Sequence, residues 1–170
     1  MKLDYFTIEL SGSVRLGFPL NNLVKVIEIK PKDLYLMPGM APFWLGIINY
    51  QGALLWVLDS HQFFNLSFVE HKPQTTLTAV ILQKQLEKSQ RRVAFTVKCL
   101  KGIITLEKPD FLSLASSLPS AYQELIKGTI LGEDQDIDIL DLEKFFSFIQ
   151  NANSMDYFTK NIPKTGEILC

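Results

Sequence analysis

An imperfect internal repeat is the feature that most constrains the fold of this chain. Three residues recur 82 positions later: Gly46 as Gly128, Asp59 as Asp141 and Phe64 as Phe146. A second similarity relates residues 26–31 to residues 104–109 with an offset of 78. A difference of one short loop reconciles the two offsets, so the repeat predicts two similarly built halves.

Residues 37–59 are predicted to form a loop, a β-hairpin and a helix N-terminus in succession. The runs 46–50 and 53–58 are short and apolar, which is typical of strands. The Gln51-Gly52 pair between them is a turn signal. Asp59 follows directly and is predicted to cap a short helix, as is its counterpart Asp141.

Further short strands at close spacing, about four or five in each half, predict an all-β fold of two small barrels. Residues 20–74, with parts of an N-terminal hairpin, are assigned to one barrel and residues 75–150 to the other. Residues 151–170 are left as a C-terminal extension. A break between two strands is expected at Lys101-Gly102. Barrels of this size have small cores, so the two are expected to share apolar surface.

Composition excludes several classes of function. A net charge of −1 argues against a nucleic-acid binder. No apolar run approaches the roughly 20 residues of a membrane helix, so no direct membrane insertion is expected. Asp4 interrupts the apolar run that a signal peptide needs, and the two cysteines do not form a disulfide framework. A cytoplasmic protein is expected.

No arrangement of residues predicts catalysis, a metal or a cofactor. His61 stands beside Asp59 at a helix start, where capping is the simpler role, and adjacent residues do not form a triad. The acids from Asp134 to Asp138 lack the Gly and Glu that a calcium loop needs. What remains is apolar surface, because Trp44, Tyr50 and Trp56 cannot all fit inside a small barrel. Either the two halves pack together there or another protein binds there.

The central stretch and its repeat resemble the CheW-like chemotaxis coupling proteins over nearly all of residues 4–150. The matching residues are Pro38-Gly39, Pro42, Leu45-Gly46-Ile47-Ile48-Asn49, Gly52, Leu58-Asp59, Gly128 and Leu140-Asp141-Leu142. The resemblance implies two five-stranded SH3-like barrels without catalytic activity. It also implies an adaptor that joins the cytoplasmic tips of chemoreceptors to the regulatory domain of a CheA-type histidine kinase, in rings of alternating subunits.

Three positions depart from the family pattern. Gln51 replaces an Arg that contributes to coupling, Trp56 replaces a Pro, and Lys98 replaces an Asp. These changes indicate a divergent member, in flagellar chemotaxis, phototaxis or type IV pilus motility.

A receptor-binding groove is expected against Leu23, Val26, Ile27 and the Gln51 turn, because a helix in a groove needs apolar anchors and little charge. The kinase is expected at apolar barrel ends. The alternative function is a small-barrel module that binds a ligand or nucleic acid.

Overall fold

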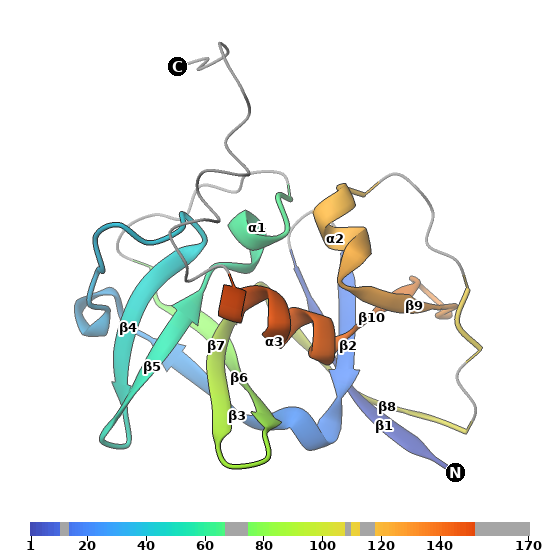
Figure 1. Ribbon diagram of the computed structural model, residues 1–170. Helices are drawn as coiled ribbons and strands as arrows, with labels where there is room; N and C mark the ends of the chain where they lie inside the picture. The colour runs from blue at the N-terminus through green and yellow to red at the C-terminus, as the bar shows by residue number, and fades with distance from the viewer. Residues whose placement is uncertain (11–13, 67–74, 108–109, 113–117, 152–170) are drawn as a thin grey trace, which may run out of the picture.

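The computed structural model describes residues 1–10, 14–66, 75–107, 110–112 and 118–151. These residues form two five-stranded sheets with short helices between and beside them (Figure 1). The strands are β1 (Leu3–Glu9), β2 (Arg15–Pro19), β3 (Leu23–Ile29), β4 (Trp44–Tyr50), β5 (Ala53–Leu58), β6 (Leu77–Gln85), β7 (Gln90–Val97), β8 (Cys99–Leu106), β9 (Ile126–Ile130) and β10 (Ile137–Leu140). The α-helices are α1 (Ser60–Phe63), α2 (Ser120–Glu124) and α3 (Leu142–Asn151), and the 3₁₀ turns are η2 (Leu20–Asn22) and η3 (Pro31–Asp33).

The two sheets have the same topology. Their strand orders are β3-β6-β7-β5-β4 and β8-β1-β2-β10-β9. Each contains one parallel pair, β5 with β7 and β10 with β2, and the other pairs are antiparallel. The order makes β3 equivalent to β8 and the hairpin β4–β5 equivalent to β9–β10. These are the elements in which the two repeated sequence stretches begin, so the internal repeat is a structural one.

The repeat extends to the register of the hairpins. Residues paired in β4–β5 are matched 82 positions later in β9–β10: Gly46 with Val57 and Gly128 with Ile139, then Trp44 with Leu58 and Ile126 with Leu140. Both hairpins have an irregularity at the same step. The predicted pair of five-stranded barrels is therefore confirmed.

The predicted assignment of strands to barrels was wrong. Strands β3 to β7, residues 23–97, form one contiguous unit, here called the central barrel. The N-terminal hairpin β1–β2 instead joins β8, β9 and β10 in the flanking barrel. Short connections explain this arrangement. Lys98 alone separates β7 from β8, and a single residue is too short to reverse the chain into a hairpin. The strand therefore continues from one barrel into the other.

The expected break at Lys101-Gly102 was also wrong. Both residues lie inside β8, where Gly102 has φ +96°. The pairing of β8 with β1 shifts register beside this glycine. Gly102 thus produces a β-bulge rather than a turn, which is the other common role of an isolated glycine in a strand.

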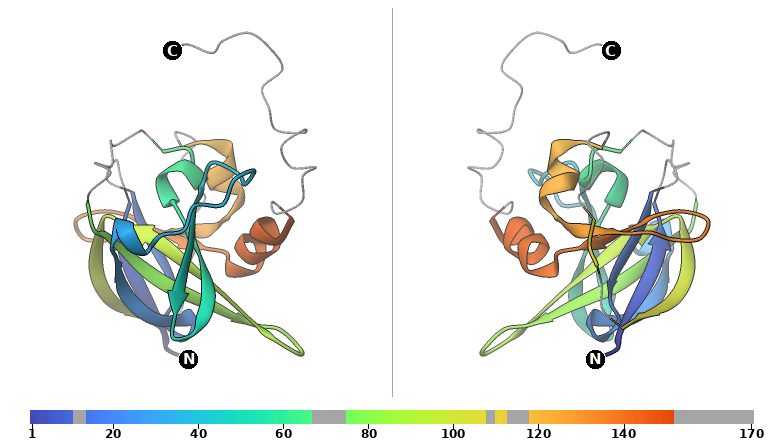
Figure 2. Two further views of the ribbon diagram at one scale, coloured as in Figure 1. Left: turned by 90° about the vertical axis from the view of Figure 1, so that its left-hand side faces the viewer. Right: turned by 90° about the vertical axis from the view of Figure 1, so that its right-hand side faces the viewer.

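A shared core joins the two barrels, as expected from their size. Alternation along β6 shows how it forms: Val80 and Leu82 point into the shared core, whereas Ala79 and Ile81 point into the central barrel. Aromatic rings from α1 and α3 also belong to the shared core. Helix α3 and the outer end of the β6–β7 hairpin project on the same side of the molecule (Figure 2). Apart from Asn151, which ends α3, the proposed C-terminal extension lies outside the described residues.

Candidate partner-binding surfaces

The β4–β5 turn presents Gln51 to solvent. Gln51 has φ +51° and Gly52 has φ +81°, the left-handed pair that tight hairpin turns require. The Asn49 side-chain oxygen accepts a hydrogen bond from the Gly52 N–H at 3.0 Å. Asn49 and Gly52 therefore build the turn, and Gln51 is the exposed residue that it carries.

Gly46 permits a close crossing of the chain over β4. Tyr35 and Ile47 exchange backbone hydrogen bonds of 2.8 and 2.9 Å, and a Cβ on Gly46 would lie 2.3 Å from the Tyr35 carbonyl oxygen. Gly128 has the same role in the flanking barrel, where a Cβ would lie 2.4 Å from the Phe111 Cβ. The crossing segment of the central barrel continues through exposed Pro38, Gly39 and Pro42, with Gly39 at φ +80°.

Asp59 and Asp141 begin α1 and α3. Asp59 is 2% exposed, and its carboxylate accepts hydrogen bonds from the N–H groups of His61 at 2.9 Å and Gln62 at 3.4 Å. Asp141 accepts one, from the Lys144 N–H at 3.1 Å. Both are therefore N-caps, and the more buried Asp59 makes the fuller set of contacts.

The four residues of the expected receptor groove are only partly brought together. Ile27 lines a hollow of about 260 Å³, here called the Ile27 hollow. Among its other lining residues are Ile29, Tyr35, Ile48, Asn49 and Tyr50. Gln51 follows Tyr50 directly, so the hollow and the turn adjoin. Leu23 and Val26 instead pack against the shared core.

The charge reversal at Lys98 has an intramolecular partner. Glu9 on β1 lies 3.2 Å from Lys98 Nζ and 2.9 Å from Lys101 Nζ, and its side chain is 17% exposed. Hydrogen bonds from Lys101 and Lys98 lower the pKa of the Glu9 carboxyl. The positive charge at position 98 therefore forms an ion pair with β1 just before β8 begins, and Lys101 within β8 forms a second one with the same carboxylate.

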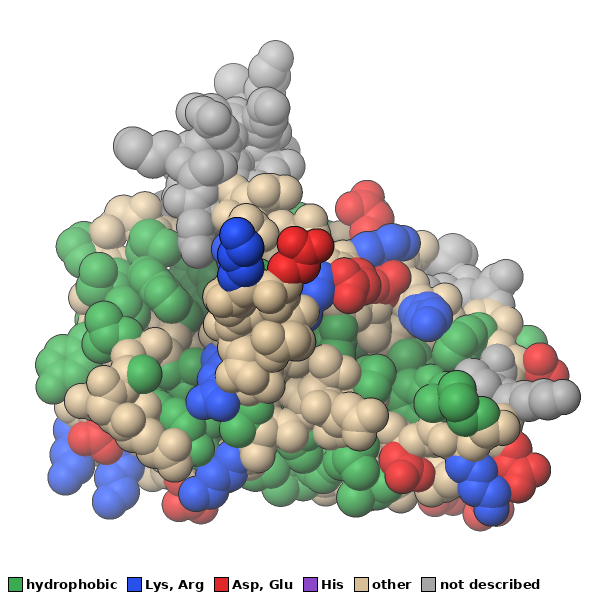
Figure 3. Space-filling model, turned by 60° about the horizontal axis from the view of Figure 1, so that its bottom comes forward, with side chains coloured by type: hydrophobic (Ala, Val, Ile, Leu, Met, Phe, Trp, Pro, Cys, Tyr) green, Lys and Arg blue, Asp and Glu red, His purple; other side chains and the backbone are tan. Residues whose placement is uncertain are grey.

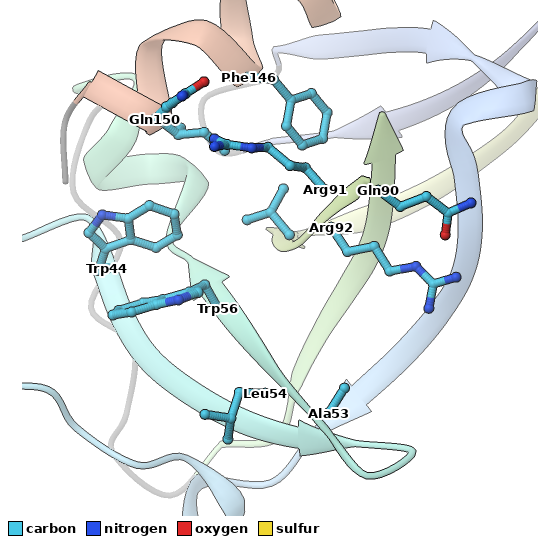
Figure 4. Close-up of a pocket in the computed structure, with 11 residues that line it drawn as sticks. Trp44, Ala53, Leu54, Trp56, Gln90, Arg91, Arg92, Phe146 and Gln150 are labelled. Carbon is cyan, nitrogen blue, oxygen red and sulfur yellow. The ribbon is translucent and has the colours of Figure 1, made fainter. Parts of the chain in front are cut away.

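The Trp56 departure helps to form a second hollow, of about 540 Å³, here called the tryptophan hollow (Figure 4). It is lined by residues from β4, β5, β7 and α3, among them Trp44, Leu54, Trp56, Arg91, Phe146 and Gln150. The Trp44 and Trp56 rings are 5.4 Å apart and tilted by 59°. Trp44 is 9% exposed, whereas Trp56 is half-buried and open to the hollow. Sequence reasoning missed Arg91 and Phe146, because nothing in the pattern joins β7 to α3.

Large apolar side chains gather at the end of the central barrel (Figure 3). Tyr35 is 66% exposed, Leu36 79% and Leu54 75%. Alternation along β5 could have identified Leu54, because Leu55 and Val57 face the core and the alternate positions, Leu54 and Trp56, must then face outward. The flanking barrel exposes Leu112, the counterpart of Tyr35 in the β9 crossing, and Leu131.

Neither a metal site nor a membrane helix is found in the described part of the chain. No group of three or more metal-ligating side chains occurs among the described residues. None of the helices there is both long and apolar enough to cross a membrane.

The family model for the CheW-like domain matches residues 4–150. The chain belongs to the CheW-like family. CheW-like proteins are non-catalytic chemotaxis scaffolds or adaptors. Among solved structures, the scaffolding protein TtCheW from Thermoanaerobacter tengcongensis is similar in fold, with a TM-score of 0.65 and 15% identity. The match covers 83% of this chain and 90% of TtCheW. No curated protein sequence matches the chain.

Proposed function

We propose that this CheW-like protein couples the cytoplasmic tip of a methyl-accepting chemoreceptor to the regulatory domain of a CheA-type histidine kinase. It catalyses nothing itself, and it works in the cytoplasm on membrane-bound receptor assemblies. The observation that carries the proposal is the Ile27 hollow beside the exposed Gln51 turn. Flagellar chemotaxis, phototaxis and pilus motility are the pathways in which such an adaptor serves.

The receptor tip lies with its apolar face in the Ile27 hollow. A helix in a groove needs a few apolar anchors, and Ile27, Tyr35 and Tyr50 supply them. At the receptor contact, Gln51 makes a neutral hydrogen bond, whereas an Arg at this position makes a charge-assisted one. The contact of Gln51 with the receptor is therefore weaker than that of an Arg in other family members. Leu23 and Val26 support β3 from the shared core, behind the contact.

The kinase meets the exposed apolar ends of the two barrels. Leu36 and Leu54 belong to the central barrel, and Leu112 and Leu131 belong to the flanking barrel. Because the barrels are repeat copies, the protein offers two similar faces on different sides. Two such faces suit a ring in which kinase and adaptor alternate.

Binding of the purified protein to a receptor-tip fragment and to the kinase regulatory domain tests the proposal. Ile27→Glu places a charge in the hollow and should abolish receptor binding, with the melting temperature and kinase binding nearly unchanged. Val24→Glu is the matched control, because Val24 lies on the same strand, is exposed and does not line the hollow. This variant should bind the receptor normally.

Two results would contradict the receptor site. Normal receptor binding by a folded Ile27→Glu variant places the site elsewhere. If Ile27→Glu unfolds the protein, the smaller change Ile27→Ala is used, and unchanged receptor affinity in that folded variant rejects Ile27 as an anchor. Failure of the unmodified protein to bind either partner rejects the adaptor function as a whole.

A further inference from the structure

The tryptophan hollow has the size and chemistry of a binding site. Its volume of about 540 Å³ accommodates several side chains. Its lining combines apolar side chains, among them Leu54 and Trp56, with the polar side chains of Arg91 and Gln150, and such polar groups fix a ligand's orientation. Here the half-buried Trp56 ring offers an aromatic face, and Phe146 from α3 closes the opposite side (Figure 4).

Arg91 gives the hollow its charge preference. Its side chain runs across the hollow toward Gln150 (Figure 4), and no ion pair or side-chain hydrogen bond of Arg91 occurs with any described residue. The neighbouring Arg92 points away from the two indoles and donates from Nε to the Gln83 side-chain oxygen at 2.8 Å. Arg91 is therefore the cation available to a ligand. A carboxylate beside an aromatic ring fits both Arg91 and Trp56.

The chain itself supplies such a pair next to the hollow. Helix α3 ends at Asn151, and Gln150 lines the hollow. The sequence continues for 19 residues beyond Asn151 and includes Met155-Asp156-Tyr157-Phe158. Asp156 lies five residues after Asn151, and an extended chain of that length spans roughly 17 Å. In an extended segment, residues two apart face the same side, so Asp156 and Phe158 can enter the hollow together.

We propose that residues 155–158 dock in the tryptophan hollow of their own chain. The Asp156 carboxylate pairs with the Arg91 guanidinium, and the Phe158 ring packs against the Trp56 indole. The docked segment covers the surface next to Leu54, so a protein that binds this end of the central barrel competes with it. The intramolecular docking does not depend on the receptor and kinase proposed above.

Nuclear magnetic resonance of the full-length chain tests the docking, with the tryptophan indoles labelled with ¹⁵N. The protein has two tryptophans, so Trp56→Phe assigns their N–H resonances. Phe158→Ser and Asp156→Lys should each shift the Trp56 resonance in the same direction. Leu169→Ser is the matched control, because it removes an apolar residue of the same extension outside the docking segment. It should leave the resonance in place.

A charge exchange identifies the pairing. Adding Arg91→Asp to Asp156→Lys should return the Trp56 resonance toward its position in the unmodified chain. Adding Arg92→Asp instead should not, because Arg92 faces Gln83. The proposal is overturned if Phe158→Ser and Asp156→Lys leave the Trp56 resonance unmoved, or if Leu169→Ser shifts it equally. Restoration by both arginine exchanges alike also overturns the assigned ion pair.

Discussion

Phe63 and Phe145 occupy equivalent positions in the two halves of the chain, 82 residues apart, and their rings meet edge to face. Their centroids are 5.4 Å apart and the rings are inclined by 78°. Each follows a capping aspartate by four residues, and its N–H donates to that aspartate's carbonyl oxygen at 2.9 Å. Contact between equivalent residues means that the two halves meet through the same element of each repeat, as in an isologous dimer.

Trp44 should be among the residues on which stability depends most. It packs against Phe43 and Trp56 in the shared core and is almost fully buried. Trp44→Ala should lower the free energy of unfolding by about 3–5 kcal/mol, measured by urea denaturation. Trp56→Ala is the control and should cost less, because Trp56 is half-buried. Equal losses for the two variants would show that burial does not determine the cost.

Removing the two helix caps should have unequal effects. Asp59→Ala leaves two N–H groups without a side-chain acceptor in a buried setting, and Asp141→Ala leaves one in a more exposed setting. The expected losses in unfolding free energy lie within about 0.5–2 kcal/mol, with Asp59 at the upper end. Asp59→Asn retains an acceptor and should lose less. A larger effect at Asp141 would contradict this ranking.

Gly46→Ala and Gly128→Ala should both be strongly destabilising, because an added methyl group meets the crossing segment. A cost of about 1–3 kcal/mol or more is expected from the overlap, measured by thermal and urea unfolding. Gly39→Ala controls for backbone strain alone, since Gly39 also has positive φ but open space around its Cβ position. If Gly39→Ala costs as much as Gly46→Ala, the overlap is not the cause.

Glu9 should make stability depend on pH in the acidic range. Its pKa is lowered in the folded state from the ordinary value of 4.5, so its contribution is fully present above about pH 4.5 and is lost as pH falls through the folded pKa. Glu9→Gln should therefore reduce the unfolding free energy at neutral pH by about 0.2–1 kcal/mol. The difference from the unmodified protein should vanish in acid. A constant difference at every pH would reject the ion pairs with Lys98 and Lys101 as its source.

The local features of the fold could be predicted from the sequence because local chemistry decides them. The Gln51-Gly52 turn and the Asp59 cap depend on residues within four positions of each other. The repeat also predicted the two barrels, since Gly46 and Gly128 solve the same steric problem of a chain crossing a strand.

The pairing of strands across the repeat could not be predicted in this way. The two hairpins β1–β2 and β6–β7 occupy equivalent places in the two sheets. The hydrophobic pattern alone therefore does not decide which hairpin joins which barrel. The connections at η2 and at Lys98 decide the outcome, and the sequence around Lys98 carries no glycine or proline to mark it. The tryptophan hollow escaped prediction for the same reason, because Arg91 and Phe146 meet only through tertiary structure.

The insertion of the central barrel between the two parts of the flanking barrel has a consequence for synthesis on the ribosome. Strands β1 and β2 emerge first and can pair only with each other until β8 to β10 follow, about 80 residues later. The central barrel can close as soon as residue 97 has emerged. Its closure fixes β3, which η2 joins directly to β2, and β7, which Lys98 joins directly to β8. Until β8 and β10 are made, the outer edges of the β1–β2 hairpin are unpaired, and strands of neighbouring nascent chains can pair with them. A folded central barrel shortens that exposure. It replaces the flexible chain between β2 and β8, so the entropy cost of bringing these strands into one sheet is smaller.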